Sequence, residues 1–127
     1  MCELLPKEMQ ILAGLETGGI PLVTAIGLES GIPCAFVRKK AKEYGTCKFA
    51  EGAPICGRNI CIIEDVVTTG GQIIKSANML REAGAKVDFV LCAIQRNDDA
   101  TEILSKEGLT LIPYMSMEYI KEQVAIS

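Results

Sequence analysis

Residues 59–73 constrain the fold of this chain more than any other stretch. Residues 59–63 form a short, largely apolar run of the kind found in buried parallel strands. A turn of small residues follows at 68–71, and residues 72–83 then carry apolar side chains at a helical spacing. A strand, a small-residue turn and a helix leave free backbone N–H groups at a helix N-terminus, where the helix dipole also attracts an anion. The stretch therefore predicts a phosphate-binding turn in an α/β fold.

The turn carries the residues that a phosphate cradle needs. Gly70 and Gly71 allow a sharp bend and a close approach of the backbone to a ligand, and Thr68 and Thr69 add hydroxyl donors. No lysine follows the glycines, so the turn is not a P-loop, and its spacing is not that of a dinucleotide-binding fingerprint. An ordinary strand-to-helix turn is the alternative interpretation.

Two acids, Glu64 and Asp65, stand between the apolar run and the turn. In that position they could bind the hydroxyls of a sugar, or water on Mg²⁺, while the turn holds a 5′-phosphate. The sequence of residues 64–71, Glu-Asp-Val-Val-Thr-Thr-Gly-Gly, resembles the phosphoribosyl pyrophosphate (PRPP) motif of type I phosphoribosyltransferases.

Composition argues against several other kinds of site and partner. The chain has no histidine, which removes histidine triads, histidine general bases and most zinc sites. Its net charge of −3 argues against nucleic acid as a partner. No apolar run approaches the roughly 20 residues that span a bilayer, and no signal peptide is apparent. The six cysteines form no CxxC pair, so we expect free thiols in a cytoplasmic protein, although Cys47 and Cys56 share one loop and could oxidise.

The remaining patterns predict one α/β domain over residues 1–127, built on a five-stranded parallel, helix-covered sheet. The expected strands are 9–13, 34–37, 59–63, 86–94 and 109–113, and the expected helices are 20–30, 72–83, 100–106 and 116–123. With strand order 2-1-3-4-5, the first and third strands are neighbours where the strand order reverses. Ligands bind beyond the carboxyl ends of such strands.

A second glycine turn is expected at that edge of the sheet. Residues 14–19, which include Thr17, Gly18 and Gly19, connect the first strand to a helix of small and apolar residues that Gly31 ends. Two such turns suggest two anion sites, as a sugar phosphate with a diphosphate would need. A plain tight connection is the alternative.

A cationic loop and one arginine complete the predicted edge. Residues 38–57 read as a long flexible loop, which in a compact domain is usually functional or disordered. It opens with four cations in five residues: Arg38, Lys39, Lys40 and Lys42. They suggest an anionic ligand, and a solvated charge run is the alternative. Arg96 follows the fourth strand, so all these features would meet at one edge.

Four separated stretches together resemble the orotate phosphoribosyltransferase family. They are residues 17–25, 36–46, 64–71 and 94–96, and the similarity extends from about residue 9 to the C-terminus. The resemblance implies transfer of a phosphoribosyl group from PRPP to orotate, with Mg²⁺ as cofactor and release of pyrophosphate. It also implies a homodimer in which the flexible loop reaches into the other subunit.

The same resemblance implies roles for single residues. Lys42 and Asp65 would be catalytic, Lys42 by stabilising the departing pyrophosphate. Thr68 and Arg96 would contact the base, and no residue is assigned as a metal ligand. The residues that would hold PRPP are Thr17, Gly18, Gly19, Arg38, Lys39, Lys42, Tyr44, Glu64, Asp65, Val66, Val67, Thr68, Thr69, Gly70, Gly71 and Gln72.

The chain departs from the family pattern in three places. Many members have Lys where this chain has Gly18, and many have His where it has Tyr44. Members also carry a hood segment before the first strand that covers the base, whereas this chain starts almost at that strand. The leading interpretation is an orotate-type transferase. A PRPP-binding regulator without turnover and a transferase for another base, such as a purine, are the alternatives; Arg96 favours an acidic pyrimidine, and Lys42 favours an enzyme.

Overall fold

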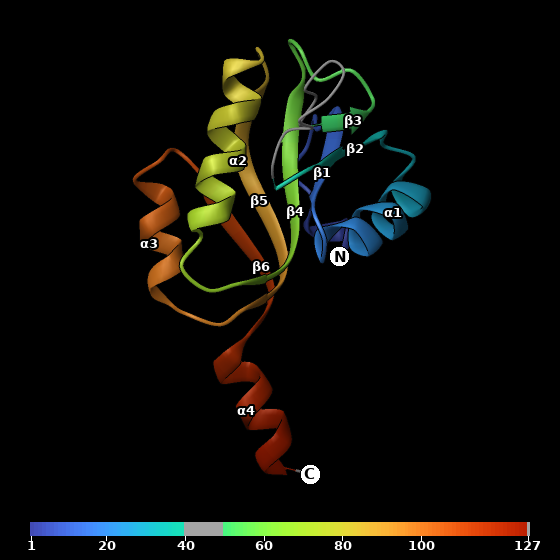
Figure 1. The fold of residues 1–127 in the computed structure, drawn as a ribbon. Helices are drawn as coiled ribbons and strands as arrows, with labels where there is room; N and C mark the ends of the chain where they lie inside the picture. Colours follow the sequence, from blue (N-terminus) through green and yellow to red (C-terminus); the bar gives the residue numbers. More distant parts are fainter. Residues whose placement is uncertain (40–49, 127) are drawn as a thin grey trace.

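The computed structural model describes residues 1–39 and 50–126 of the chain. Its strands form one six-stranded sheet in the order β3-β2-β1-β4-β5-β6 (Figure 1). The strands are β1 (Ile11–Leu15), β2 (Cys34–Val37), β3 (Ala50–Gly52), β4 (Asn59–Val67), β5 (Lys86–Gln95) and β6 (Thr110–Ser116). The helices are the 3₁₀ turn η1 (Cys2–Leu4), α1 (Gly19–Ser30), α2 (Gly71–Glu82), α3 (Asp99–Ser105) and α4 (Met117–Ile126).

Five of these strands form the predicted parallel sheet in the predicted order. The sixth, β3, corrects the prediction of five strands, because it lies inside the stretch 38–57 that we expected to be a loop. It runs antiparallel to β2 and pairs with the backbone groups that β2 would otherwise expose at the sheet edge. Gly52 permits this pairing, since a Cβ there would lie 2.6 Å from the Cys34 carbonyl oxygen.

Two strands near the predicted site differ from their predicted bounds. β4 continues to Val67 because β5 continues beside it, with Val67 paired to Gln95. The two acids that we expected to follow the strand therefore lie within it. β1 is displaced two residues toward the C-terminus, so Gly14 belongs to the strand rather than to the glycine turn. A Cβ on Gly14 would overlap the Val23 side chain, which means that this glycine lets α1 pack closely on β1.

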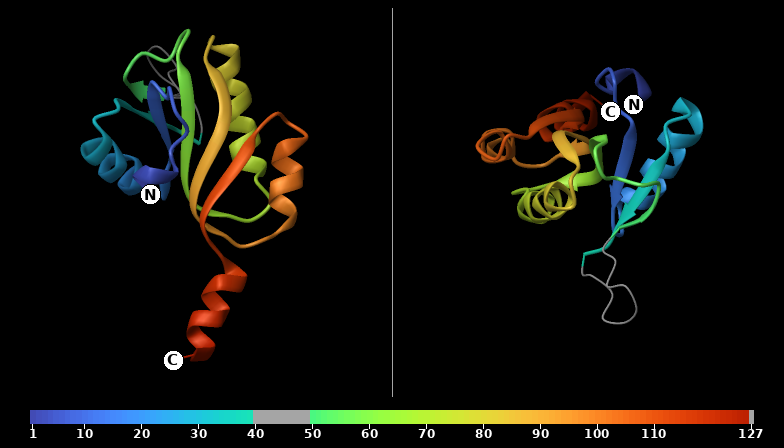
Figure 2. Two further views of the ribbon diagram at one scale, coloured as in Figure 1. Left: turned by 180° about the vertical axis from the view of Figure 1, so that it is seen from behind. Right: turned by 90° about the horizontal axis from the view of Figure 1, so that it is seen from above.

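Helices cover both faces of the sheet, as predicted. α1 lies on one face, and α2 and α3 lie on the other (Figure 2). β4 alternates between the two sides: Ile60 and Ile62 pack in the core under α2 and α3, whereas Cys61 and Ile63 pack under α1. A central parallel strand buried on both faces explains why residues 59–63 read as a nearly continuous apolar run.

The last helix, α4, extends from the end of β6 away from the rest of the molecule (Figure 1). None of the helices in the described part of the chain is long and apolar enough to cross a membrane. The cysteines in the described ranges, which exclude Cys47, are free thiols. Burial raises the pKa values of Cys61 and Cys92 to about 12, so both thiols stay protonated and act as small apolar core residues.

Candidate functional site

Backbone hydrogen bonds join the carboxyl ends of neighbouring strands into one continuous edge. The Glu16 N–H donates to the Val37 carbonyl at 2.8 Å, which ties the end of β1 to the end of β2. The Arg96 N–H donates to the Val67 carbonyl at 2.9 Å, which ties the end of β5 to the end of β4. Since β1 and β4 are adjacent, the two glycine turns, the start of the cationic stretch and Arg96 lie at the same edge, as predicted.

The β4–α2 turn has the geometry of an anion cradle. Gly70 caps the N-terminus of α2 with a left-handed backbone (φ 85°), and no side chain caps the free N–H groups of the first turn. The turn lines a cavity of about 290 Å³ together with Glu64, Val66, Val67 and Gln72. At Gly71 an added Cβ would come no nearer than 4.0 Å to the Thr69 hydroxyl, so the cavity side of this glycine is open. A phosphate could therefore reach the N–H groups at the helix end.

Gly70 is needed for packing as well as for conformation. Besides its positive φ, a Cβ there would lie 2.9 Å from a methyl carbon of Leu104 in α3. The cradle thus rests directly on α3, a contact that the sequence pattern did not indicate.

The two acids connect the cradle to the first glycine turn. The Asp65 N–H donates to Glu64 Oε1 at 2.9 Å, and the Val66 N–H donates to Asp65 Oδ1 at 2.7 Å. A Cβ on Gly18 would overlap the Asp65 carboxylate, and a Cβ on Gly19 would overlap the Ile63 carbonyl oxygen. The glycines of the first turn, where the Glu16–Thr17 peptide bond is cis, are therefore pressed against β4 at its acids. Two motifs that the sequence placed 47 residues apart, at Gly18 and Asp65, share one surface.

Glu64 holds its proton more tightly than an ordinary glutamate. Burial raises its pKa from 4.5 to about 7, and the neighbouring Asp65 carboxylate adds to the rise. The Asp65 N–H and the positive charge of Lys39 act in the opposite direction. The charge of Lys39 is therefore near enough to Glu64 to lower the pKa of that carboxyl slightly.

This shift predicts a pH-dependent stability. The folded chain binds the Glu64 proton more tightly than the unfolded chain does, so the free energy of unfolding should fall as pH rises from about 4.5 to about 7. Glu64→Gln removes that dependence. We expect the gain in the free energy of unfolding over the wild type to be small at pH 5 and larger at pH 8, measured by urea denaturation without ligand. If the free energies of unfolding of the variant and the wild type differed by the same amount at both pH values, Glu64 would be ionised at both.

The cationic stretch is only partly described. Lys40, Lys42 and Tyr44 lie outside the described residues. The Lys39 N–H donates to Glu16 Oε1 at 3.1 Å, so a carboxylate of the first turn holds the backbone that carries Lys39. Arg38 is paired with Glu51 of β3 at 2.9 Å, a contact that the sequence did not predict for a PRPP-binding residue.

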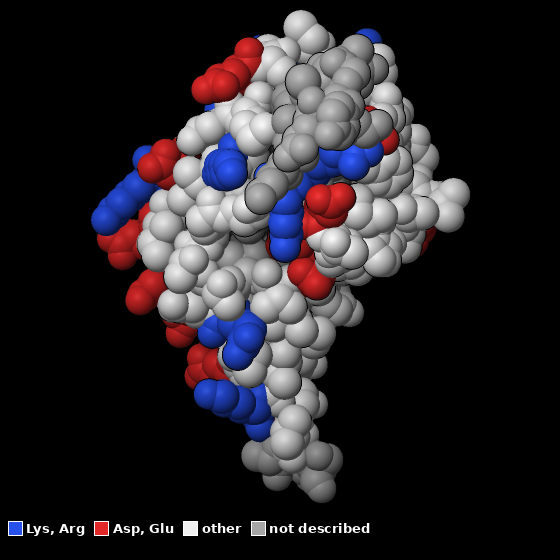
Figure 3. Space-filling model, viewed as in Figure 1, with Lys and Arg blue, Asp and Glu red and all other residues white. Residues whose placement is uncertain are grey.

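Among the described residues on the face seen in Figure 3, the basic side chains form no broad patch. They lie singly or directly beside acidic ones (Figure 3).

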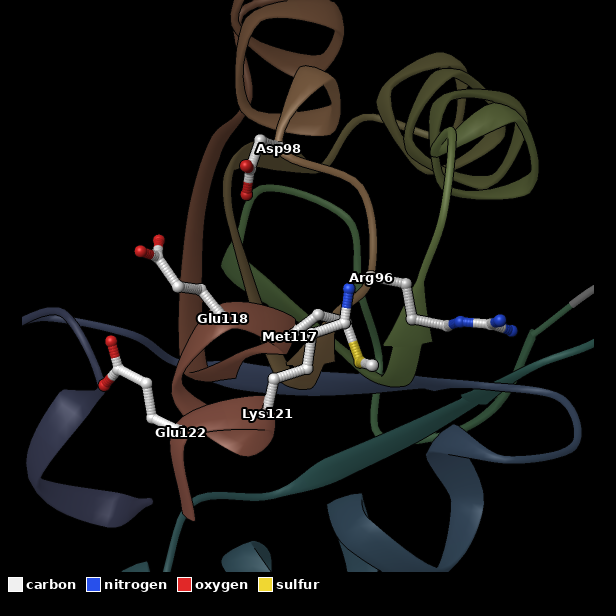
Figure 4. A pocket seen from close by; sticks show the side chains of 6 residues that line it. All are labelled: Arg96, Asp98, Met117, Glu118, Lys121 and Glu122. Carbon is white, nitrogen blue, oxygen red and sulfur yellow. The ribbon is translucent and has the colours of Figure 1, made fainter. Parts of the chain in front are cut away.

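Arg96 is exposed and lies beside a wider, open cavity of about 550 Å³. The other lining residues are Asp98, Met117, Glu118, Lys121 and Glu122. The Arg96 guanidinium points away from the side chains of α4 (Figure 4). No sequence pattern indicated that α4 would lie beside Arg96, because the position of α4 depends on how far β6 extends along β5.

The described residues contain no group of three or more His, Cys, Asp or Glu side chains that could hold a metal ion. Mg²⁺ does not require such a group when it arrives with a phosphorylated substrate, because it keeps several waters and needs only one or two carboxylates. Glu64 and Asp65 can supply that number, so the residues present fit a substrate-borne Mg²⁺.

Proteins named orotate phosphoribosyltransferase match nearly the whole chain. The protein of Nocardioides sp. is 47% identical over 116 residues, which make up 91% of this chain and 65% of that protein. The protein of Methanocaldococcus jannaschii is 37% identical over 121 residues, which make up 95% of this chain and 69% of that protein. The chain spans slightly less than two thirds of the Nocardioides protein and of its counterpart from Pyrococcus abyssi, with 65% and 66% covered.

Solved structures agree with the sequence relatives. A phosphoribosyltransferase from Corynebacterium diphtheriae has a TM-score of 0.81 at 30% identity and is matched over 89% of this chain and 67% of its own. Orotate phosphoribosyltransferase from Aeropyrum pernix has a TM-score of 0.78 at 26% identity, with 94% and 67% covered. No protein-family model matches the chain. The fold is that of the type I phosphoribosyltransferases, and the sequence shows that the chain belongs to the orotate phosphoribosyltransferase family.

Proposed function

We propose that this chain transfers the phosphoribosyl group of PRPP to orotate, which yields orotidine 5′-phosphate and pyrophosphate. The observation that carries the proposal is the position of Asp65, which lies between the Gly18 turn and the cradle that begins at Thr68. PRPP has the matching layout, with ribose hydroxyls between a 5′-phosphate and a diphosphate. The family relationship supports the same substrates, although the named relatives are longer than this chain.

Each part of PRPP has a proposed partner. The cradle from Thr68 to Gln72, with Val66 and Val67 at its base, holds the 5′-phosphate through backbone N–H groups. Glu64 and Asp65 accept hydrogen bonds from the ribose hydroxyls.

The diphosphate and the base lie on either side of the ribose. Thr17, Gly18 and Gly19 line the diphosphate, and the basic side chains that neutralise it belong to Arg38, Lys39 and Lys42, with Tyr44 beside them. Arg96 and Thr68 contact the base. A guanidinium suits the carboxylate of orotate, because it can donate two parallel hydrogen bonds to it.

The proposed reaction is dominated by charge. The C1–O bond to pyrophosphate breaks with its electron pair on the leaving oxygen, and the N1 atom of orotate forms the new bond to C1. The N1 proton passes to the departing pyrophosphate. Positive charge develops on the ribose beside Glu64 and Asp65, whose carboxylates stabilise it. Mg²⁺, when bound, supplies positive charge to the leaving diphosphate. No histidine is needed as a general base.

We propose a homodimer in the cytoplasm, as the family resemblance implies. Free cysteines among the described residues suit a reducing compartment. Sedimentation equilibrium at micromolar concentration distinguishes a dimer from a monomer.

The decisive experiment combines binding and turnover. PRPP with Mg²⁺ at about 100 times its Kd should raise the free energy of unfolding by about 2.7 kcal/mol. The absorbance of orotate should then fall when orotate, PRPP and Mg²⁺ are mixed with the protein. Stabilisation without loss of orotate would identify a binding protein that lacks turnover. A melting temperature that PRPP and Mg²⁺ do not change would show that the chain has no PRPP site.

A further inference from the structure

The residue immediately before Arg96 carries a buried amide side chain. Gln95, the last residue of β5, is 6% exposed, and in the described residues only Ser76 is a comparably buried polar residue. Its Nε2 donates to the Asn97 carbonyl at 3.1 Å and to Thr101 Oγ1 at 2.9 Å, with the Asp98 carbonyl at 3.5 Å. These acceptors lie in the loop that follows Arg96 and in the first turns of α3. Gln95 therefore ties both segments to the end of the sheet.

The same helix also supports the cradle. Leu104, one turn beyond Thr101, is fully buried and lies against the position where Gly70 has no side chain. On the opposite side of the loop, the Arg96 N–H is held by the Val67 carbonyl, immediately before the cradle. The distance from the cradle to the Arg96 backbone is thus set by α3 on one side and by β4 on the other.

Burial alone does not explain these hydrogen bonds. Asp98 and Thr101 are exposed, and Asn97 is partly exposed, so water could reach this part of the loop. A side chain that only filled the core here could be apolar. What the amide provides is a defined position for the loop, because its two N–H donors point at acceptors on two different segments.

We infer that Gln95 and Thr101 are positioning residues that set selectivity for the base by holding the loop of Arg96 at a fixed distance from the phosphate cradle. This inference rests on the proposed transfer reaction. With the 5′-phosphate held at the cradle, the guanidinium meets the carboxylate of the base only if the loop does not move. Loosening the loop should weaken binding of the base and leave binding of PRPP unchanged. It should also reduce the preference for orotate over uracil, because uracil lacks the carboxylate.

Thr101 offers the mildest test, since it is exposed on a helix and Thr101→Val removes only the hydroxyl acceptor. We expect Thr101→Val to raise KM for orotate about three- to tenfold, as for the loss of one neutral hydrogen bond. KM for PRPP should stay within about twofold of the wild type, because the cradle contacts are unchanged. Thr101→Ser, which keeps the hydroxyl, is the matched control and should behave like the wild type. Gln95→Met, nearly the same size, should act in the same direction more strongly.

A second measurement asks whether the pair acts through Arg96. In an Arg96→Ala background, Thr101→Val should change the remaining orotate KM by less than about twofold, because the group it positions is gone. The inference would be overturned if Thr101→Val raised the orotate KM as much in the Arg96→Ala background as in the wild type. It would also be overturned if Thr101→Val alone changed KM for orotate and for PRPP equally. Either result would leave the proposed transfer reaction standing. A wild-type protein that binds PRPP but turns over neither orotate nor uracil would overturn the proposed function, and the selectivity role with it.

Discussion

Asp65→Asn is expected to lower kcat/KM for PRPP by about 10²–10³-fold, the usual loss when a preorganised electrostatic contact to a transition state is removed. The carboxylate lies between the two glycine turns, where the ribose hydroxyls and the developing positive charge of the proposed reaction would be. Asn keeps the shape of the side chain and an oxygen that can accept the Val66 N–H, now bonded to Oδ1 at 2.7 Å. The free energy of unfolding should therefore change little.

A matched control for this variant exists on the same sheet. Asp88 is exposed near the amino end of β5, at the far edge from the site, so Asp88→Asn should leave both activity and stability nearly unchanged. Steady-state kinetics with varied PRPP, together with urea denaturation, cover both measurements. If Asp65→Asn unfolds while its folded fraction keeps normal kcat/KM, the residue supports the fold and has no part in the reaction.

Gly18→Ala is expected to lower kcat/KM for PRPP about 10²-fold, because it should displace the carboxylate that Asp65→Asn neutralises. A Cβ at this position would overlap the Asp65 carboxylate, and the short aspartate side chain can avoid it only by rotating away from its present place. Isothermal titration with PRPP measures the part of this loss that lies in ground-state binding.

Two comparisons make this prediction specific. Gly31→Ala, at a left-handed glycine (φ 77°) with no atom within 4 Å, should cost about 1 kcal/mol of stability and leave PRPP kinetics unchanged. Gly18→Ala combined with Asp65→Asn should be less harmful than the product of the two single effects, because both act on one carboxylate. Fully multiplicative losses would show that Gly18 acts on PRPP independently of Asp65.

Local patterns in the sequence were sufficient for the strands themselves and, once the strand order of a known α/β sheet was assumed, for the edge at which the site lies. Apolar runs marked the strands, and the predicted β2 (Cys34–Val37) agrees with the structure residue for residue. The glycine that ends α1, Gly31, has the left-handed backbone expected of it. These features depend on neighbours a few residues away, so periodicity and glycine placement were enough to predict them. Parallel strands with short connections can adopt only a few topologies. In the order found here, the two glycine turns meet at the carboxyl ends of adjacent strands.

The tertiary structure decided what depends on partners distant in the sequence. β3 exists because β2 offers an open edge, and β4 reaches Val67 because β5 continues beside it. The close approach of Gly18 to the Asp65 carboxylate follows from the register of β1 on β4, in which Gly14 pairs with Ile63. Only the packing of α3 places Thr101 on Gln95. Strand length, register and helix packing are set by surfaces that meet across the fold, and no local pattern of residues encodes them.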